Sequence, residues 1–167
     1  LIPVFVYGEH RQEFSKHHIL QGIEGISFVY TSSTVDLFAM VITREGSGED
    51  SCRVAIVKYE RDEIDGSTYH RPICQIVGEV YLIPREGLSE LDESFGMDYS
   101  RIPVRIKHSA GHFISAITYH STKIDAFDRK SCVRLPQGDF ERFADMIGGE
   151  EELFQIFVPR TCRAYDG

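Results

Sequence analysis

The chain opens with a short apolar run that ends at a glycine. Ile2–Val6 is interrupted only by Pro3 and is rich in β-branched and aromatic residues, which is typical of a strand buried on both faces. The pattern therefore predicts a strand at the centre of a sheet. Tyr7 and Gly8 follow, and the polarity then reverses over residues 9–11.

This junction has two interpretations. Gly8 lacks a Cβ, so the backbone there can turn sharply or come close to a bound group. The N–H groups of Glu9, His10 and Arg11 follow the end of the strand and would be free to point at an anion or a carbonyl. Alternatively, Gly8 only ends a core strand and the three polar residues form a solvated turn. Both interpretations stay open on this stretch alone.

Apolar periodicity predicts several more strands and three short helices. Gly78, inside the strand expected at Ile73–Ile83, indicates a bulge or a close backbone approach. The strands expected at Arg101–Lys107 and His112–His120 would form a hairpin with Ser109–Gly111 as its turn. The expected strands are Ile23–Thr31, Val35–Thr43, Val54–Tyr59, Ile73–Ile83, Arg101–Lys107 and His112–His120, and the expected helices are Glu13–Gln21, Arg85–Leu91 and Asp139–Ile147, the last stopped by Gly148.

Two polar stretches interrupt this pattern, near residues 44–51 and 60–71. They have little to bury and are expected to be surface loops, because charge runs of this kind are usually solvated. With 167 residues, the chain is predicted to form a single domain over residues 1–167 that carries these two insertions.

Composition narrows the classes of function. A formal net charge of −8 argues against broad binding of a nucleic-acid backbone, although a local anion site stays possible. No apolar run is long enough for a membrane helix, so we expect no membrane partner. The cysteines lack C-x-x-C spacing, which predicts free thiols, no zinc site and an intracellular reducing compartment, either cytoplasm or an organelle matrix after removal of a targeting segment. They are Cys52, Cys74, Cys132 and Cys162.

Two motifs resemble the γ-glutamylcyclotransferase-like (AIG2-like) family. That family usually opens with VFVYGTLR, and here Glu9 and His10 stand in place of Thr and Leu. Its second signature, V-x-G-E-V-Y followed by L-x-x-L-D-x-x-E-G and Y-x-R, is matched in order by Val77–Tyr81, Leu88–Gly96 and Tyr99–Arg101. The resemblance runs from about Ile2 to Ile147 and implies an α+β fold, with a mostly antiparallel barrel-like sheet and a few short helices.

The resemblance also implies a reaction. Members of the family cyclise a γ-glutamyl group: the α-amine attacks the γ-carbonyl, which releases 5-oxoproline and an amine or amino acid. One carboxylate can deprotonate the attacking amine and then protonate the leaving nitrogen, without a cofactor. The family assigns this role to the glutamate of L-D-x-x-E-G. The ligand-binding residues expected here are Tyr7, Gly8, Glu9, His10, Arg11 and Tyr99.

The sequence departs from the family at that glutamate, because Phe95 occupies its position. Glu93 is the nearest glutamate and our candidate for catalysis, but two residues of a helix turn a side chain by roughly 200°. The side chain of Asp92 points in a direction closer to that of Phe95, but it is shorter and lies about one helical turn earlier. Losing a general acid or base usually costs about a hundredfold to ten-thousandfold in rate.

Two classes of function follow. One is a catalytically impaired domain that acts as a binding or assembly module with protein partners in a larger complex. The other is an active cyclotransferase that uses Glu93, Asp92 or Glu9 on a γ-glutamyl small molecule. A negative Glu9 would repel the substrate's α-carboxylate, which favours the first class, while His10 or Arg11 could bind an anion such as a phosphate.

Overall fold

The computed structural model describes residues 1–44, 52–58, 74–123, 132–135 and 138–151. The two predicted insertions lie outside these residues, except for Arg44. The elements in chain order, with η for 3-10 helices, are β1 (Ile2–Val6), η1 (Gly8–His10), α1 (His17–Gln21), β2 (Ser27–Arg44), β3 (Cys52–Lys58), β4 (Cys74–Ile83), η4 (Arg85–Gly87), α2 (Leu88–Phe95), β5 (Tyr99–Lys107), η5 (Ser109–Gly111), β6 (Phe113–Ser121), β7 (Cys132–Leu135) and α3 (Phe140–Ile147).

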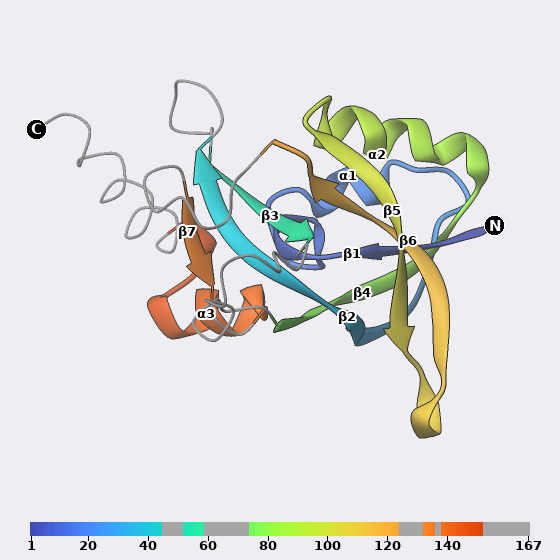
Figure 1. The fold of residues 1–167 in the computed structure, drawn as a ribbon. Coiled ribbons are helices and arrows are strands. Elements are labelled where there is room, and N and C mark those ends of the chain that lie inside the picture. Colours follow the sequence, from blue (N-terminus) through green and yellow to red (C-terminus); the bar gives the residue numbers. More distant parts are fainter. Residues whose placement is uncertain (45–51, 59–73, 124–131, 136–137, 152–167) are drawn as a thin grey trace, which may run out of the picture.

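The strands form one sheet that closes into a small barrel (Figure 1). β1 lies between β4, to which it is antiparallel, and β6, to which it is parallel. The other pairings of the described residues are antiparallel, and the bridge between Thr34 and Ile106 joins β2 to β5 and closes the ring. The predicted α+β fold with a mostly antiparallel, barrel-like sheet is confirmed.

The extent of β2 differs from the prediction. Two strands separated at Ser32–Ser33 were expected, but Ser27–Arg44 is one continuous strand. Its pairing with β4 is irregular between Ser33 and Leu37. There the buried hydroxyl of Thr34 accepts a hydrogen bond from the N–H of Ile76 (2.9 Å) and donates to the carbonyl of Asp36 (2.7 Å). The side chain therefore replaces backbone pairing, so the polar residues do not end the strand.

Beyond this irregularity β2 leaves the barrel and lies between two other strands. Its C-terminal half pairs with β3 on one side and with β7 on the other. β7 was not predicted. The end of β2 is deeply buried, with Met40, Val41 and Ile42 at 0% exposure, and both of its edges are covered by these strands.

The central position of β1 is confirmed, and its last three residues, Val4–Val6, are fully buried. Gly78 on β4 is required for this packing. A Cβ at Gly78 would lie 2.2 Å from the carbonyl oxygen of Val6 and 2.6 Å from the ring of Phe5. Of the two roles expected for Gly78, the close backbone approach is therefore observed where the end of β1 lies beside β4.

The helices differ from the prediction mainly at their ends. α1 begins at His17 instead of Glu13, because Glu13 has a positive φ of 72° that is incompatible with a helix. α2 continues to Phe95 and stops at Gly96, whose φ is 88°. α3 agrees with the prediction: Asp139 caps it by accepting from the N–H of Arg142, and Gly148 ends it in the left-handed region.

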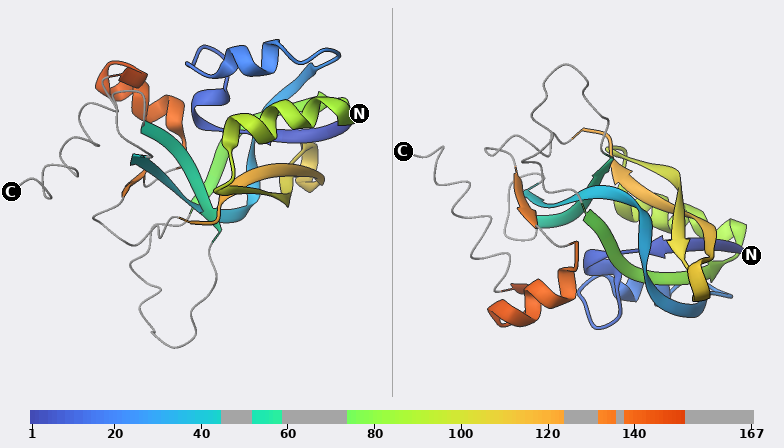
Figure 2. Two further views of the ribbon diagram at one scale, coloured as in Figure 1. Left: turned by 90° about the horizontal axis from the view of Figure 1, so that it is seen from above. Right: turned by 60° about the horizontal axis from the view of Figure 1, so that its bottom comes forward.

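The helices surround the opening loop that follows β1. Figure 2 shows α1 and α2 packed side by side on the barrel, with α3 on the other side of the loop. Leu20 of α1 and Leu88 and Leu91 of α2 are buried in the shared core. Among the described residues, no helix has the length and apolar character needed to cross a membrane.

Candidate functional site

The loop after β1 is buried and closed on itself. η1 is entered through Gly8, whose φ of 61° favours glycine. The N–H of His10 bonds to the carbonyl of Tyr7 (3.4 Å), and the N–H of Arg11 bonds to the carbonyl of Gly8 (3.1 Å). These two donors were expected to be free for a ligand, but the turn itself uses them. The alternative of a solvated turn is also wrong, since Glu9, His10 and Arg11 are each 3% exposed.

Two side chains of this loop hold the edge of β3. The carboxylate of Glu9 accepts a hydrogen bond from the N–H of Val54 (2.8 Å), and the hydroxyl of Tyr7 accepts one from Ile56 (3.3 Å). A Cβ on Gly8 would lie 2.9 Å from the side chain of Val54. The space in front of the Tyr-Gly turn is therefore filled by the protein's own strand.

The two side chains that hold β3, Tyr7 and Glu9, have raised pKa values and ionise less readily than usual. Burial raises the pKa of Tyr7 well above its usual range, and its hydroxyl donates to the carbonyl of Tyr119 (2.6 Å). Burial also raises the pKa of Glu9, although Lys16 lies 3.4 Å from its second oxygen and acts in the opposite direction. A buried carboxylate with a raised pKa is the usual property of a group that exchanges protons.

A stack of three rings occupies the position where the family motif has its glutamate. Phe95, 2% exposed, lies between His10 and Tyr119. Its ring centroid is 4.4 Å from that of His10, at an interplanar angle of 15°, and 4.3 Å from that of Tyr119, at 4°. Tyr99 closes the edge of the stack, with its ring tilted and 5.4 Å from Phe95.

Arg53, on β3, fixes the end of α2 beside this stack. Its guanidinium donates to the carbonyls of Phe95 (2.8 Å) and Ser94 (3.3 Å) and lies 4.6 Å from the ring centroid of Tyr99. Burial lowers the pKa of His10 to about 3, so His10 is neutral near pH 7. Neither Arg53 nor Tyr119 was singled out from the sequence, because neither lies in a recognisable motif.

Neither Asp92 nor Glu93 of α2 lies within the stack, although Asp92 reaches the hydroxyl of Tyr119 at its rim. Phe95 is buried and Glu93 is exposed, which agrees with the expected rotation of about 200° between them. Asp92 accepts hydrogen bonds from Nε of Arg101 (2.8 Å) and from the hydroxyl of Tyr119 (2.6 Å). The bond from Arg101 lowers the pKa of Asp92, so this carboxylate stays ionised.

Glu93 instead lies on the outer side of α2, at a shallow, open depression between α1 and α2. No residue of the opening loop lines this depression. Its lining consists of His18, Ile19, Gly22, Glu90, Glu93 and Ser94.

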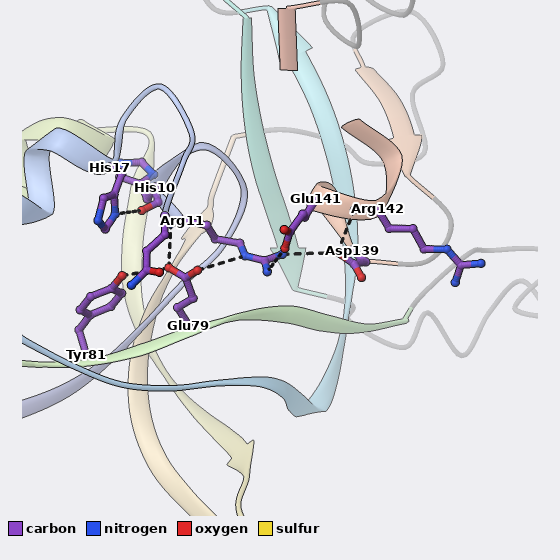
Figure 3. Close-up of polar contacts among 9 residues, drawn as sticks. His10, Arg11, His17, Glu79, Tyr81, Asp139, Glu141 and Arg142 are labelled. Atoms are coloured by element: carbon purple, nitrogen blue, oxygen red, sulfur yellow. Dashed lines mark hydrogen bonds and ion pairs between the residues drawn. The ribbon is translucent and has the colours of Figure 1, made fainter. Parts of the chain in front are cut away.

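Arg11 lies in a separate buried cluster, drawn in Figure 3. Its guanidinium bonds to Glu141 of α3 (2.7 Å) and to Asp139, the cap of α3 (3.4 Å). Its Nε lies 3.7 Å from Glu79 of β4. Because three carboxylates already surround Arg11, a ligand anion would have to displace one of them.

Glu79 ties the same cluster to the loop. Its Oε1 accepts hydrogen bonds from the N–H of Gln12 (2.9 Å) and the hydroxyl of Tyr81 (3.0 Å). On the other side of the loop, Nδ1 of His17 lies 3.0 Å from the carbonyl oxygen of His10 (Figure 3). Within the described ranges, no three His, Cys, Asp or Glu side chains are grouped so that they could hold a metal ion.

The fold and this loop together define the class: a closed, mostly antiparallel barrel whose first strand runs into a buried Tyr-Gly turn facing the end of α2. A model of the family described as gamma-glutamyl cyclotransferase, AIG2-like, matches residues 4–142. The chain belongs to this family, which confirms the resemblance noted in its sequence. A comparison with curated proteins finds no match.

Solved structures with this fold are similar in shape and distant in sequence. A gamma-glutamyl cyclotransferase is 18% identical with a TM-score of 0.55, over 81% of this chain and 72% of its own. An AIG2-like protein from Mus musculus is 18% identical with a TM-score of 0.56, over 74% and 79%. Allophanate hydrolase from Kluyveromyces lactis is 12% identical with a TM-score of 0.60, over 92% of this chain and only 21% of its own length.

Proposed function

We propose that this chain keeps the γ-glutamyl cyclotransferase fold without the family's proton-transfer reaction and acts as a binding or assembly module. The observation that carries the proposal is the stack formed by His10, Phe95 and Tyr119. A phenyl ring cannot exchange a proton, and its stacking on both faces leaves no room for a glutamyl group beside it.

The opening loop supports the same proposal. Glu9 and Tyr7 are bonded to the backbone of β3, and two of the loop's N–H groups bond within the turn. A substrate would therefore have to displace β3 and leave the buried N–H of Val54 without its partner. Such a loss costs on the order of 1–3 kcal/mol.

The assembly role is supported by the context in which the fold occurs elsewhere. In Kluyveromyces lactis, the structures of allophanate hydrolase and of urea amidolyase contain this fold within 21% and 8% of their chains. Domains of this shape therefore occur as parts of much larger proteins. By analogy, we propose that this domain contacts other protein surfaces. A reducing compartment is proposed with it, in keeping with the free thiol of Cys74.

One observation favours the alternative, an active cyclotransferase. Glu9 is a buried carboxylate with a raised pKa and lies next to Gly8, so it combines the position and the proton affinity that a general base needs. In that function Glu9 would have to leave Val54 to reach a substrate. Glu93 and Asp92 remain the other candidates for this role.

The test is release of 5-oxoproline. The purified chain is incubated with γ-glutamyl dipeptides and γ-glutamyl amines, and 5-oxoproline is measured against a blank without protein. The proposal predicts no release above the blank. The variants Glu9→Gln, Asp92→Asn and Glu93→Gln are measured in parallel, with Glu90→Gln as the control because Glu90 is exposed on the same helix.

The active alternative would be established, and the proposed silent function disproved, by robust turnover of the wild-type chain. That turnover would have to be abolished by one of the three carboxylate variants and unchanged in Glu90→Gln. The variant that loses turnover would identify the proton carrier.

A further inference from the structure

The hairpin of β5 and β6 projects from the barrel and ends at η5 (Figure 1). Among the described residues, β6 pairs with β1 at Val4 and Ile117. The outer edge of β6 from Phe113 to Ala116 has no strand partner in the same set of residues. An open edge of this kind is a template onto which another extended segment can pair.

The outer edge of β5 is closed by side chains. The carboxylate of Asp36 accepts a hydrogen bond from the backbone N–H of Arg105 (2.8 Å), and the hydroxyl of Ser32 donates to the carbonyl of Lys107 (2.8 Å). As far as the structure describes the chain, the open backbone groups at the hairpin end therefore lie on the β6 side.

The hairpin also differs in charge from the rest of the molecule. The whole chain has a formal charge of −8, yet the segment from Tyr99 to Ser121 contains no Asp or Glu and carries Arg101, Arg105 and Lys107. Charge asymmetry of this kind steers partners of opposite sign to the basic side.

Two of these three cations are neutralised by carboxylates that the structure describes, and Lys107 is bonded differently. Arg101 bonds to Asp92, and Arg105 bonds to Asp36. Lys107 donates to the neutral amide of Gln75 (2.6 Å) and has no carboxylate partner among the described residues. The exposed imidazoles of His108 and His112 lie beyond it at the end of the hairpin.

An aromatic side chain lies beside this charge. Phe113 is 53% exposed at the start of the open edge, and the guanidinium of Arg105 lies 5.6 Å from its ring centroid. Exposed aromatic residues next to cations are frequent anchors of protein interfaces.

We infer that the projecting end of the β5–β6 hairpin docks an extended, acidic segment of a partner protein. The segment pairs with the edge of β6 at Phe113–Ala116 and places an apolar side chain on Phe113. Its carboxylates are attracted by the charge of Lys107 on the neighbouring strand, β5. This inference rests on the proposed function as a binding module and names the chemistry of its partner.

A protein segment fits this surface better than a nucleic acid. Tight binding of a phosphate backbone usually needs about six to ten cationic contacts. Among the described residues of the hairpin, Lys107 is the one cation without a carboxylate partner, and the net charge of −8 on the whole chain would repel a polyanion.

Fluorescence anisotropy with a labelled peptide of alternating glutamate and valine tests the inference on the whole chain. We expect saturable binding that weakens with added salt. Lys107→Glu should weaken binding roughly tenfold, because it replaces an attraction by a repulsion. Lys123→Glu is the matched control: it makes the same charge change at an exposed lysine just beyond the other end of β6, and should change binding by less than about twofold.

Strand addition has its own test. Two further peptides carry methyl groups on alternate backbone nitrogens, one on the odd and one on the even positions. An added strand bonds to β6 through one of its edges, so methylation should abolish binding in one of the two peptides. The inference is overturned if both methylated peptides bind like the parent, if the two lysine variants have equal effects, or if the parent peptide does not bind. Tighter binding of an oligothymidylate, or equal binding of a lysine–valine peptide, also overturns it. None of these results depends on 5-oxoproline release, so failure here leaves the proposed silent function intact.

Discussion

Phe95 is the residue at which this chain departs from the chemistry expected of its family. A glutamate at this position would need a partly apolar pocket that is open to substrate. The phenyl ring instead stacks on His10 and Tyr119 and is 2% exposed, so it takes part in the core. The phenyl ring cannot carry a proton, and it fills the space between His10 and Tyr119.

Truncating Phe95 should mainly affect stability. Phe95→Ala removes a buried ring between two others and should lower the free energy of unfolding by about 3–5 kcal/mol. Urea unfolding followed by circular dichroism measures this loss. The matched control is Glu93→Ala on the exposed face of the same helix, expected within about 0.5 kcal/mol of wild type. A loss below about 1 kcal/mol for Phe95→Ala would contradict the stacked arrangement.

His10 should make stability depend on pH. Its pKa is lowered to about 3 in the folded state and has an ordinary value of 6.5, so between these values the unfolded chain binds the extra proton. Stability should therefore fall as the pH drops through this window, by up to roughly 1.4 kcal/mol per pH unit from this group.

The variant His10→Phe keeps a ring on Phe95 but cannot titrate. Compared with wild type by urea unfolding at several pH values, its stability should fall less between pH 6.5 and 3. Glu9 acts with the opposite sign, since its raised pKa makes its contribution decrease as the pH rises. Glu9 is present in both proteins, so the difference between the two curves isolates His10, and parallel curves would show that His10 is not buried as a neutral group.

At the scale of elements, Arg11 joins the opening loop to α3. It bonds to the cap of α3 and to its first turn, and Glu79 of β4 lies behind it (Figure 3). The side chain of Arg11 is only 4% exposed, so its charge depends on these carboxylates. α3 is therefore held to the loop by a partly buried ion cluster as well as by the packing of Phe14 against Phe140.

Removing this arginine should release α3. Arg11→Met leaves the buried carboxylate of Glu79 without its cation and should cost about 3–5 kcal/mol of unfolding free energy. Hydrogen exchange should show the largest loss of protection in α3. Glu141→Gln is the control, because this side chain is 47% exposed and its pair should be worth at most about 1 kcal/mol. Equal protection of α3 in both variants would mean that apolar packing alone holds it.

The elements also show how far the sequence could be interpreted. Periodicity predicted β1, β4, the β5–β6 hairpin and α3, because their residues repeat with the period of the element they form. It failed at β2, where a buried threonine hydroxyl replaces backbone pairing, and at the start of α1, which depends on the left-handed backbone of Glu13. The first is a contact between two strands, and neither feature has a recognisable signature in the sequence.

The candidate site was predicted only in part. The motifs located the opening loop and identified the missing glutamate at Phe95. They could not show that Glu9, His10 and Arg11 are buried, nor that each is bound to a different element: β3, α2 and α3. Arg53 and Tyr119 reach the site from strands distant in sequence, so only the fold brings them there.

At the scale of the whole molecule, the barrel has the fold of its family, and its opening loop is bonded to β3 and packed against α2. The groups expected to meet a ligand bond to the protein itself, and among the described residues of the projecting hairpin Lys107 has no carboxylate partner. This arrangement is expected of a domain whose contacts are made on its outside.

The central claim is that the space between the opening loop and α2 is filled, and binding of a substrate analogue tests it most directly. Amide signals of Gly8, Glu9, His10 and Tyr99 can be followed by NMR in the labelled chain while γ-glutamylalanine is added to about 10 mM, enough to detect a Kd of about 1 mM. We predict that these signals do not move. Saturable shifts at Gly8–His10 would show that the site admits a γ-glutamyl group and would contradict this account.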